Sequence, residues 1–113
     1  PALRVPNPPS NVGHSYYRLY VFCRPEVLRA GWSRDRIISE LTAQGVPFFE
    51  GICSEIYREK AFDGADFRPR EALPVARELG ETGIAFLVHP TLEPNDVDRI
   101  AAIAARIITL ATR

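Results

Sequence analysis

The chain has 113 residues, of which 46% are hydrophobic and 25% charged, and its formal net charge at pH 7 is zero. This length suits one domain that can bury a core. The balanced charge argues against a nucleic-acid surface, because phosphate binding needs an excess of Lys and Arg, and equally against a polybasic membrane surface. No apolar run approaches the roughly 20 residues of a membrane-spanning helix. The two cysteines, Cys23 and Cys53, are too few for a secreted disulfide scaffold, so we expect reduced packing residues in a cytoplasmic protein.

Residues 1–13 are expected to form an extended linker that precedes one domain of residues 14–113. Proline is frequent in this segment, and proline fixes φ and lacks an N–H donor, so neither a helix nor a central strand is expected. The sequence begins at Pro1 rather than Met. We therefore expect an excised or processed piece of a longer protein.

The stretch GHSYYRLYVFC, residues 13–23, predicts the first strand, from Ser15 to Cys23. Successive side chains of a strand point to opposite faces. One face is mostly apolar and is expected to pack against helices: Tyr17, Leu19, Val21 and Cys23. The other face is aromatic with one charge, which is typical of a sheet face that meets another domain or a ligand: Tyr16, Arg18, Tyr20 and Phe22.

A helix is predicted after residue 33. Ser33 is the expected N-cap, and Asp35 places a negative charge in the first turn, where it suits the helix dipole. Trp32 is expected to pack on Ile37 as a hydrophobic staple, and Gly45 to end the helix as its C′ residue. The expected buried stripe consists of Ile37, Ile38 and Leu41.

Residues 46–49 predict a short strand at a sheet edge, because Pro47 cannot donate a ladder hydrogen bond. Residues 53–62 predict a short helix. Residues 63–69 predict a loop by their Gly, Asp and Pro content.

Residues 71–80 predict a second helix, stopped by Gly80, and residues 83–88 predict a buried strand. Residues 94–112 predict the last helix, with Pro94 in its first turn. Its apolar residues recur at helical spacing: Val97, Ile100, Ile103, Ala104, Ile107 and Ile108. The order β-α-β-(α)-α-β-α predicts the α+β class, a two-layer sandwich in which helices cover a small, mostly antiparallel sheet.

Few residues suggest catalysis. Lys60 is the single lysine; it could form a Schiff base, or it is simply a solvated residue on a short polar helix. No Gly-rich phosphate loop is present. Cys53 lies near Glu55, whose negative charge disfavours a thiolate nucleophile. We therefore expect a domain that contributes to a site without carrying the catalytic group.

His14 and His89 both stand at the end of a predicted strand. They are far apart in sequence and have no Cys or carboxylate partners at ligand spacing, so no metal site is predicted. Each is either a turn residue that bonds to nearby backbone or part of a loop that reaches a ligand on a neighbouring domain.

Three stretches together resemble the C-terminal small domain of the pyridoxal-phosphate-dependent sugar aminotransferases, the DegT/DnrJ/StrS family. GHSYYRLYVFC resembles the family's opening of this domain, and SRDRIISELTAQGVP resembles its helix and turn. LPVARELGETGIAFLVHPTLEPNDVDRI resembles the segment that leads into its final helix, and CSEIYREKAF is similar to members that act in surface-polysaccharide synthesis. The similarity runs from about His14 to the end of the chain.

The resemblance implies an enzyme that transfers an amino group, usually from glutamate, to a nucleotide-linked keto sugar for lipopolysaccharide synthesis. It implies pyridoxal phosphate in the full-length protein and none in this fragment, because the family's cofactor lysine lies in the missing N-terminal domain and Lys60 does not align with it. It also implies a homodimer. His14, Ser15, Tyr16 and Tyr17 are the expected substrate-binding residues, at the entrance of a strand that closes one side of the cleft.

A second reading stays open: a stand-alone small α+β module that binds a ligand or mediates dimerisation without catalysis. A reading frame that begins near Pro1 would favour this module, and a lysine-bearing cofactor domain upstream would favour the aminotransferase.

Overall fold

The computed structural model describes residues 2–50 and 53–113. Four strands and three α-helices are present in this part of the chain: β1 (Leu3–Arg4), β2 (Arg18–Cys23), α1 (Arg34–Ala43), β3 (Phe48–Glu50), α2 (Pro74–Thr82), β4 (Gly83–Leu87) and α3 (Pro94–Ala111). Three short 3₁₀ turns accompany them: η1 (Pro25–Val27), η2 (Ile56–Arg58) and η3 (Lys60–Phe62). No helix within these ranges is both long and apolar enough to cross a membrane.

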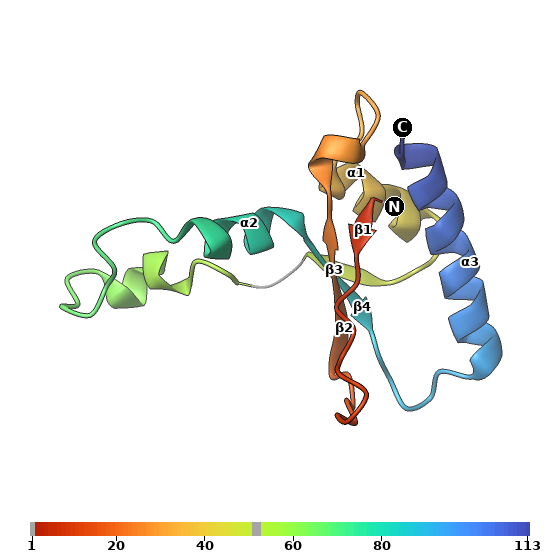
Figure 1. Ribbon diagram of the computed structural model, residues 1–113, viewed down its shortest axis with the longest axis horizontal. Helices are drawn as coiled ribbons and strands as arrows, with labels where there is room; N and C mark the ends of the chain where they lie inside the picture. Colours follow the sequence, from red (N-terminus) through yellow and green to blue (C-terminus); the bar gives the residue numbers. More distant parts are fainter. Residues whose placement is uncertain (1, 51–52) are drawn as a thin grey trace.

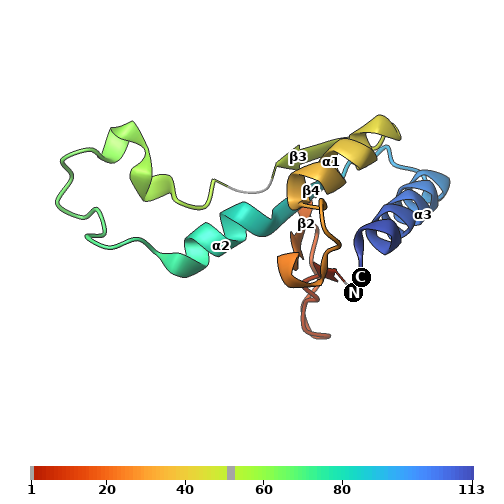
Figure 2. The same ribbon diagram turned by 90° about the horizontal axis from the view of Figure 1, so that it is seen from above.

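The four strands form one antiparallel sheet in the order β1-β2-β4-β3. Helices α1 and α3 lie on one side of this sheet, while α2 and the turns before it project from the other side (Figures 1 and 2). The predicted α+β fold class, a small antiparallel sheet covered by helices, is confirmed. The place of β3 at the edge also confirms the interpretation of Pro47.

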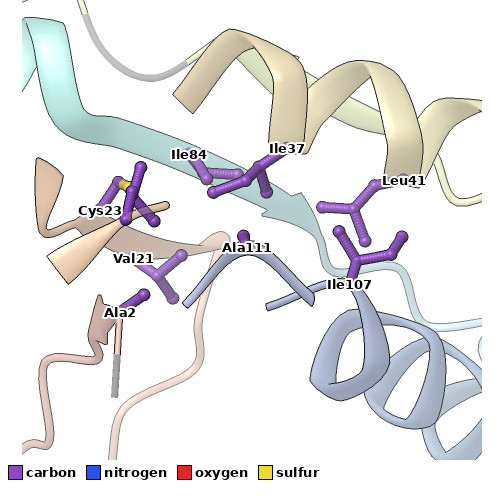
Figure 3. Close-up of a cluster of buried hydrophobic side chains, with 9 residues drawn as sticks. Ala2, Val21, Cys23, Ile37, Leu41, Ile84, Ile107 and Ala111 are labelled. Carbon is purple, nitrogen blue, oxygen red and sulfur yellow. The ribbon is translucent and has the colours of Figure 1, made fainter. Parts of the chain in front are cut away.

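The core lies between the sheet and helices α1 and α3 (Figure 3). Val21 and Cys23 of β2 and Ile84 of β4 meet Ile37 of α1 and Ile107 of α3 there. The other members of the buried cluster are Ala2, Leu28, Leu41 and Ala111. Each large aliphatic side chain buried in this way stabilises the fold by about 1.5–3 kcal/mol.

The ends of α1 follow the predicted local rules. Ser33 is extended, and its hydroxyl accepts a hydrogen bond from the backbone N–H of Arg36 at 3.2 Å. Trp32 packs against the core cluster that contains Ile37, as a staple requires. Gly45 follows the helix with φ of 72°, the left-handed conformation that a C′ glycine adopts without steric cost.

The first residues are packed more closely than a linker would be. Pro1 lies outside the described residues, but Ala2 is fully buried and Leu3–Arg4 pair with Cys23 and Phe22 of β2. Hydrogen bonding to the edge of the sheet therefore recruits residues 2–4 into the domain. The proposed division into residues 1–13 and 14–113 stays a prediction.

The prediction that Gly80 stops the second helix is wrong, because α2 continues to Thr82. A Cβ atom at position 80 would collide with the hydroxyl of Ser54 and come within 3.1 Å of Ser54 Cβ. Gly80 is therefore required by close packing, not by helix termination. Residues 53–62, predicted as a short helix, form the separate turns η2 and η3.

Three expected core positions are exposed. The alternation in the sequence predicts Tyr17 on the apolar face of the first strand, but β2 begins only at Arg18 and Tyr17 is 82% exposed. Val97 is the first residue of the predicted apolar stripe of α3; it lies in the first turn of the helix and is 52% exposed. Both cysteines are free, as the sequence predicts. Cys23 is buried and is the expected packing residue, whereas Cys53 is exposed and is not.

Candidate functional site

The segment that enters β2 adopts an unusual backbone conformation. Tyr16 has φ of +48°, in the left-handed region. A bulky residue rarely adopts this region, because its Cβ crowds the backbone. Such a conformation costs on the order of 1–3 kcal/mol and persists only where the surroundings hold it.

His14 is the group that holds Tyr16. The backbone N–H of Tyr16 donates to Nδ1 of His14 at 2.9 Å. The two rings lie 4.3 Å apart between centroids, tilted by 44°. Because Nδ1 accepts this bond, the neutral imidazole carries its proton on Nε2. The left-handed turn is thus fixed by one hydrogen bond and one ring contact from the same residue.

Tyr16 lies between two hollows. The larger, about 590 Å³, is lined mainly by apolar groups: Val5, Pro6, Asn7, Ser15, Tyr16, Leu19 and Val88. The smaller, about 260 Å³, lies toward the aromatic face of β2: Pro6, His14, Tyr16, Arg18, Leu19, Tyr20 and Phe22. The volume of the larger hollow falls within the range of about 300–1,000 Å³ that is typical of small-molecule sites, and the volume of the smaller one lies just below that range.

The structure brings together three of the four predicted site residues. His14 and Tyr16 share the smaller hollow, and Ser15 and Tyr16 share the larger one. Tyr17 lines neither of them; it is exposed, with the guanidinium of Arg18 5.5 Å from its ring centroid. The substrate-binding role of these residues stays a prediction, and Tyr16 is its best-placed member.

The sequence does not predict the other residues that line the larger hollow. Val5, Pro6 and Asn7 come from the amino-terminal segment, and Val88 follows β4. The prolines of residues 1–13 predict an extended segment. An extended segment can lie along the sheet and line a hollow, and the sequence gives no other sign that this one does. Nothing in that signal says which strand the segment lies beside.

The second face of the sheet is open and aromatic, as the alternation in the first strand predicted. The strand register places Tyr20, Ala85 and Phe49 in one row across β2, β4 and β3. Arg18 lies 4.7 Å from the Phe49 ring centroid, and Arg4 lies 4.4 Å from that of Phe22. Phe49 is 46% exposed. We call this surface the open sheet face.

His89 serves its own turn. Its Nδ1 lies 2.8 Å from the Thr91 hydroxyl, and the backbone N–H of Thr91 donates to the same nitrogen at 3.3 Å. It borders a separate cavity of about 90 Å³, which is lined mostly by apolar side chains. These contacts match the local hydrogen-bonding alternative for this residue.

A lysine that holds pyridoxal phosphate forms a Schiff base with it, and the sequence contains one lysine, Lys60. Lys60 is exposed in η3, on the projecting segment, whereas a Schiff-base lysine is activated by an enclosed or charged pocket. The thiol of Cys53 donates a hydrogen bond to Oε1 of Glu59 at 3.7 Å. Within residues 2–50 and 53–113, no cluster of three potential ligands could hold a metal ion.

Comparisons with known proteins place this geometry in context. No protein-family model and no curated protein sequence matches the chain. An aminotransferase from Psychrobacter cryohalolentis, solved by X-ray crystallography, is similar at 45% identity with a TM-score of 0.81, over 88% of this chain and 25% of that chain.

Two further structures share the fold at lower identity. A DegT DnrJ EryC1 StrS aminotransferase from Brucella abortus is 20% identical with a TM-score of 0.73, over 93% of this chain and 26% of that chain. The aminotransferase TlmJ from Streptoalloteichus hindustanus is 22% identical with a TM-score of 0.74, over 96% and 27%. The chain thus spans about a quarter of the length of each of the three structures.

Proposed function

This chain is an aminotransferase-derived domain with the fold of the DegT/DnrJ/EryC1/StrS aminotransferases, and from this premise we propose that it is the C-terminal small domain of an enzyme that aminates a nucleotide-linked keto sugar. The resemblance predicted from the sequence is thereby confirmed. We propose glutamate as the amino donor, lipopolysaccharide or other surface-polysaccharide synthesis as the purpose, and the cytoplasm as the location. The observation that carries the proposal is the 45% identity to an aminotransferase over 88% of the chain.

The domain contributes one wall of the substrate site and none of the cofactor chemistry. Pyridoxal phosphate, when bound in the rest of the enzyme, supplies the electron sink for amino transfer. His14, Ser15 and Tyr16 border the two hollows at the entrance of β2, where an aromatic ring with a polar tip suits a sugar or a base. Tyr17, which lines neither hollow, is left at the rim of the proposed site.

The remaining three quarters of the enzyme would cover the open sheet face. A row of aromatic side chains with flanking arginines is costly to leave in water and marks a contact surface. The projecting segment of residues 53–82 carries further exposed apolar side chains: Ile56, Phe67, Leu73 and Val75. We propose that the cofactor domain of the same chain contacts these surfaces first, and that a second subunit of a homodimer contacts what remains exposed.

The test uses the full-length protein. Purified with pyridoxal phosphate, it is incubated with glutamate and a nucleotide-linked keto sugar, and the products are identified by mass spectrometry. We expect an amino sugar nucleotide and an equal amount of 2-oxoglutarate. Transfer to 2-oxo acids but not to any nucleotide-linked keto sugar would refute the substrate class.

The alternative, a stand-alone binding or dimerisation module, is decided by the natural reading frame and by one control. The 113-residue chain alone is treated with pyridoxal phosphate and borohydride, and trapped adducts are mapped. We expect no stoichiometric adduct on Lys60. A specific adduct there, or a frame that encodes this domain alone, would contradict the aminotransferase proposal.

A further inference from the structure

We propose that Tyr16 is the residue of this domain that contacts the ligand, and that His14 is a positioning residue that acts through Tyr16. This inference rests on the proposed function and deepens it by dividing the roles within one site. It reverses the simpler expectation that the histidine itself binds the nucleotide sugar.

The first argument is conformational. Tyr16 alone among the non-glycine residues described has a positive φ, at +48°. A sequence under no constraint would place glycine or asparagine there, since these tolerate the left-handed region. A strained backbone at the mouth of a hollow points to a role for the side chain that the strain orients.

The second argument is the direction of the hydrogen bond. Nδ1 of His14 is occupied by the N–H of Tyr16 at 2.9 Å, and the His14 ring lies against the Tyr16 ring. One nitrogen and one face of the imidazole are thus already in use within the turn. Tyr16, by contrast, lines both hollows, whereas His14 lines only the smaller one.

The third argument is the chemistry of the larger hollow. Val5, Pro6, Leu19 and Val88 surround Tyr16 with apolar groups. Such a lining suits the flat face of a base or sugar ring, which stacks on an aromatic side chain. An imidazole would bring a charge or a donor to this hollow, and it does not line the hollow.

The role of His14 then follows from population arithmetic. If Tyr16 is in the binding conformation for only a fraction of the time, the apparent dissociation constant rises by the inverse of that fraction. Loss of the His14 hydrogen bond releases the left-handed turn, and we expect about a tenfold rise in KM, equivalent to about 1.4 kcal/mol. The value of kcat stays unchanged, because ground-state and transition-state binding are lost equally.

The experiment compares four single variants and one double variant of the full-length enzyme with wild type. His14→Ala removes the acceptor, whereas His14→Asn restores one, because an asparagine side chain can accept from the N–H two residues on. Tyr16→Ala removes the proposed contact, and Val97→Ala is the control, because Val97 is exposed and lines neither hollow. KM and kcat are measured with the keto-sugar nucleotide, and dissociation constants are measured by calorimetry with UDP-N-acetylglucosamine and dTDP-glucose as probes.

We expect KM to rise about tenfold in His14→Ala and in Tyr16→Ala. The KM of His14→Asn and of Val97→Ala should stay within about twofold of wild type. The decisive measurement is the double variant His14→Ala/Tyr16→Ala, which should be no weaker than Tyr16→Ala alone, since His14 has no residue left to act through.

Two results would overturn the inference. Additive losses in the double variant, or no recovery in His14→Asn, would place His14 in direct contact with the ligand. A wild-type KM in Tyr16→Ala would remove Tyr16 from the site.

The outcomes also separate this inference from the proposed function. An enzyme that binds a probe with the expected pattern but aminates no keto sugar refutes only the function. An enzyme that aminates the sugar without the pattern refutes only the inference. An enzyme that neither binds a probe nor transfers an amino group refutes both.

Discussion

Replacing Gly80 by alanine distinguishes close packing from helix termination at this position. In the structure α2 runs past Gly80 to Thr82, and Ser54 packs directly against the glycine. An added Cβ would overlap the Ser54 hydroxyl and lie 3.1 Å from Ser54 Cβ. The backbone carbonyl of Gly80 also accepts a hydrogen bond from Arg34 at 3.0 Å, so α2 cannot simply move away without loss.

Two opposing effects set the magnitude. Overpacking of a filled site costs about 1–3 kcal/mol, and alanine in place of glycine inside a helix gains about 0.8–1.0 kcal/mol. We therefore expect a net loss of about 1 kcal/mol for Gly80→Ala. In a Ser54→Ala background the oxygen is gone and only the tight Cβ contact remains, so the same substitution should become neutral or stabilising.

The free energy of unfolding in urea is measured for wild type, both single variants and the double variant, with amide exchange to follow α2. A coupling energy of about 1–2 kcal/mol between the two sites is expected. If Gly80 instead ended the helix, alanine would cost the same with or without the Ser54 hydroxyl. Equal losses in the two backgrounds would refute the packing explanation.

The remaining predictions concern the core and the thiols. Ile37→Ala should lower the free energy of unfolding by about 2–5 kcal/mol, because Ile37 is fully buried, whereas Val97→Ala, at a position 52% exposed, should change it by no more than about 0.5 kcal/mol; equal losses in thermal melts would contradict the core assignment. Cys53 should react with a thiol reagent in the folded protein, whereas Cys23 should react only after unfolding, and mass spectrometry of the labelled peptides checks the order. Burial, assisted by the charge of Glu26, raises the pKa of the Cys23 thiol. Above about pH 8.5 the unfolded chain therefore binds fewer protons than the folded one, so stability should fall as pH rises, and Cys23→Ala should remove that slope; an unchanged alkaline slope in the variant would rule this cause out.

Much of the fold is predictable from short sequence patterns: helix caps, glycines that end helices, and the alternation of apolar side chains along a strand. The helix of residues 34–43 was identified by the Ser33 cap and the Gly45 terminator, which satisfy backbone groups within one turn. The alternation along residues 18–23 separated the buried Val21 and Cys23 from an open aromatic face. Family resemblance, rather than any catalytic motif, indicated an aminotransferase, because this domain carries no catalytic group of its own to recognise.

Contacts between distant segments were decided only by the tertiary structure. The pairing of Leu3–Arg4 with β2 and the approach of Ser54 to Gly80 join residues that no periodicity relates, since a hydrophobic pattern states which face is buried but not what covers it. The sequence by itself marked residues 14–17 as the polar-aromatic entrance of a strand. That Tyr16 turns left-handed over two hollows, while Tyr17 points into solvent, depends on a hydrogen bond to His14 and on the walls built by Val5 and Val88, which lie in separate parts of the chain.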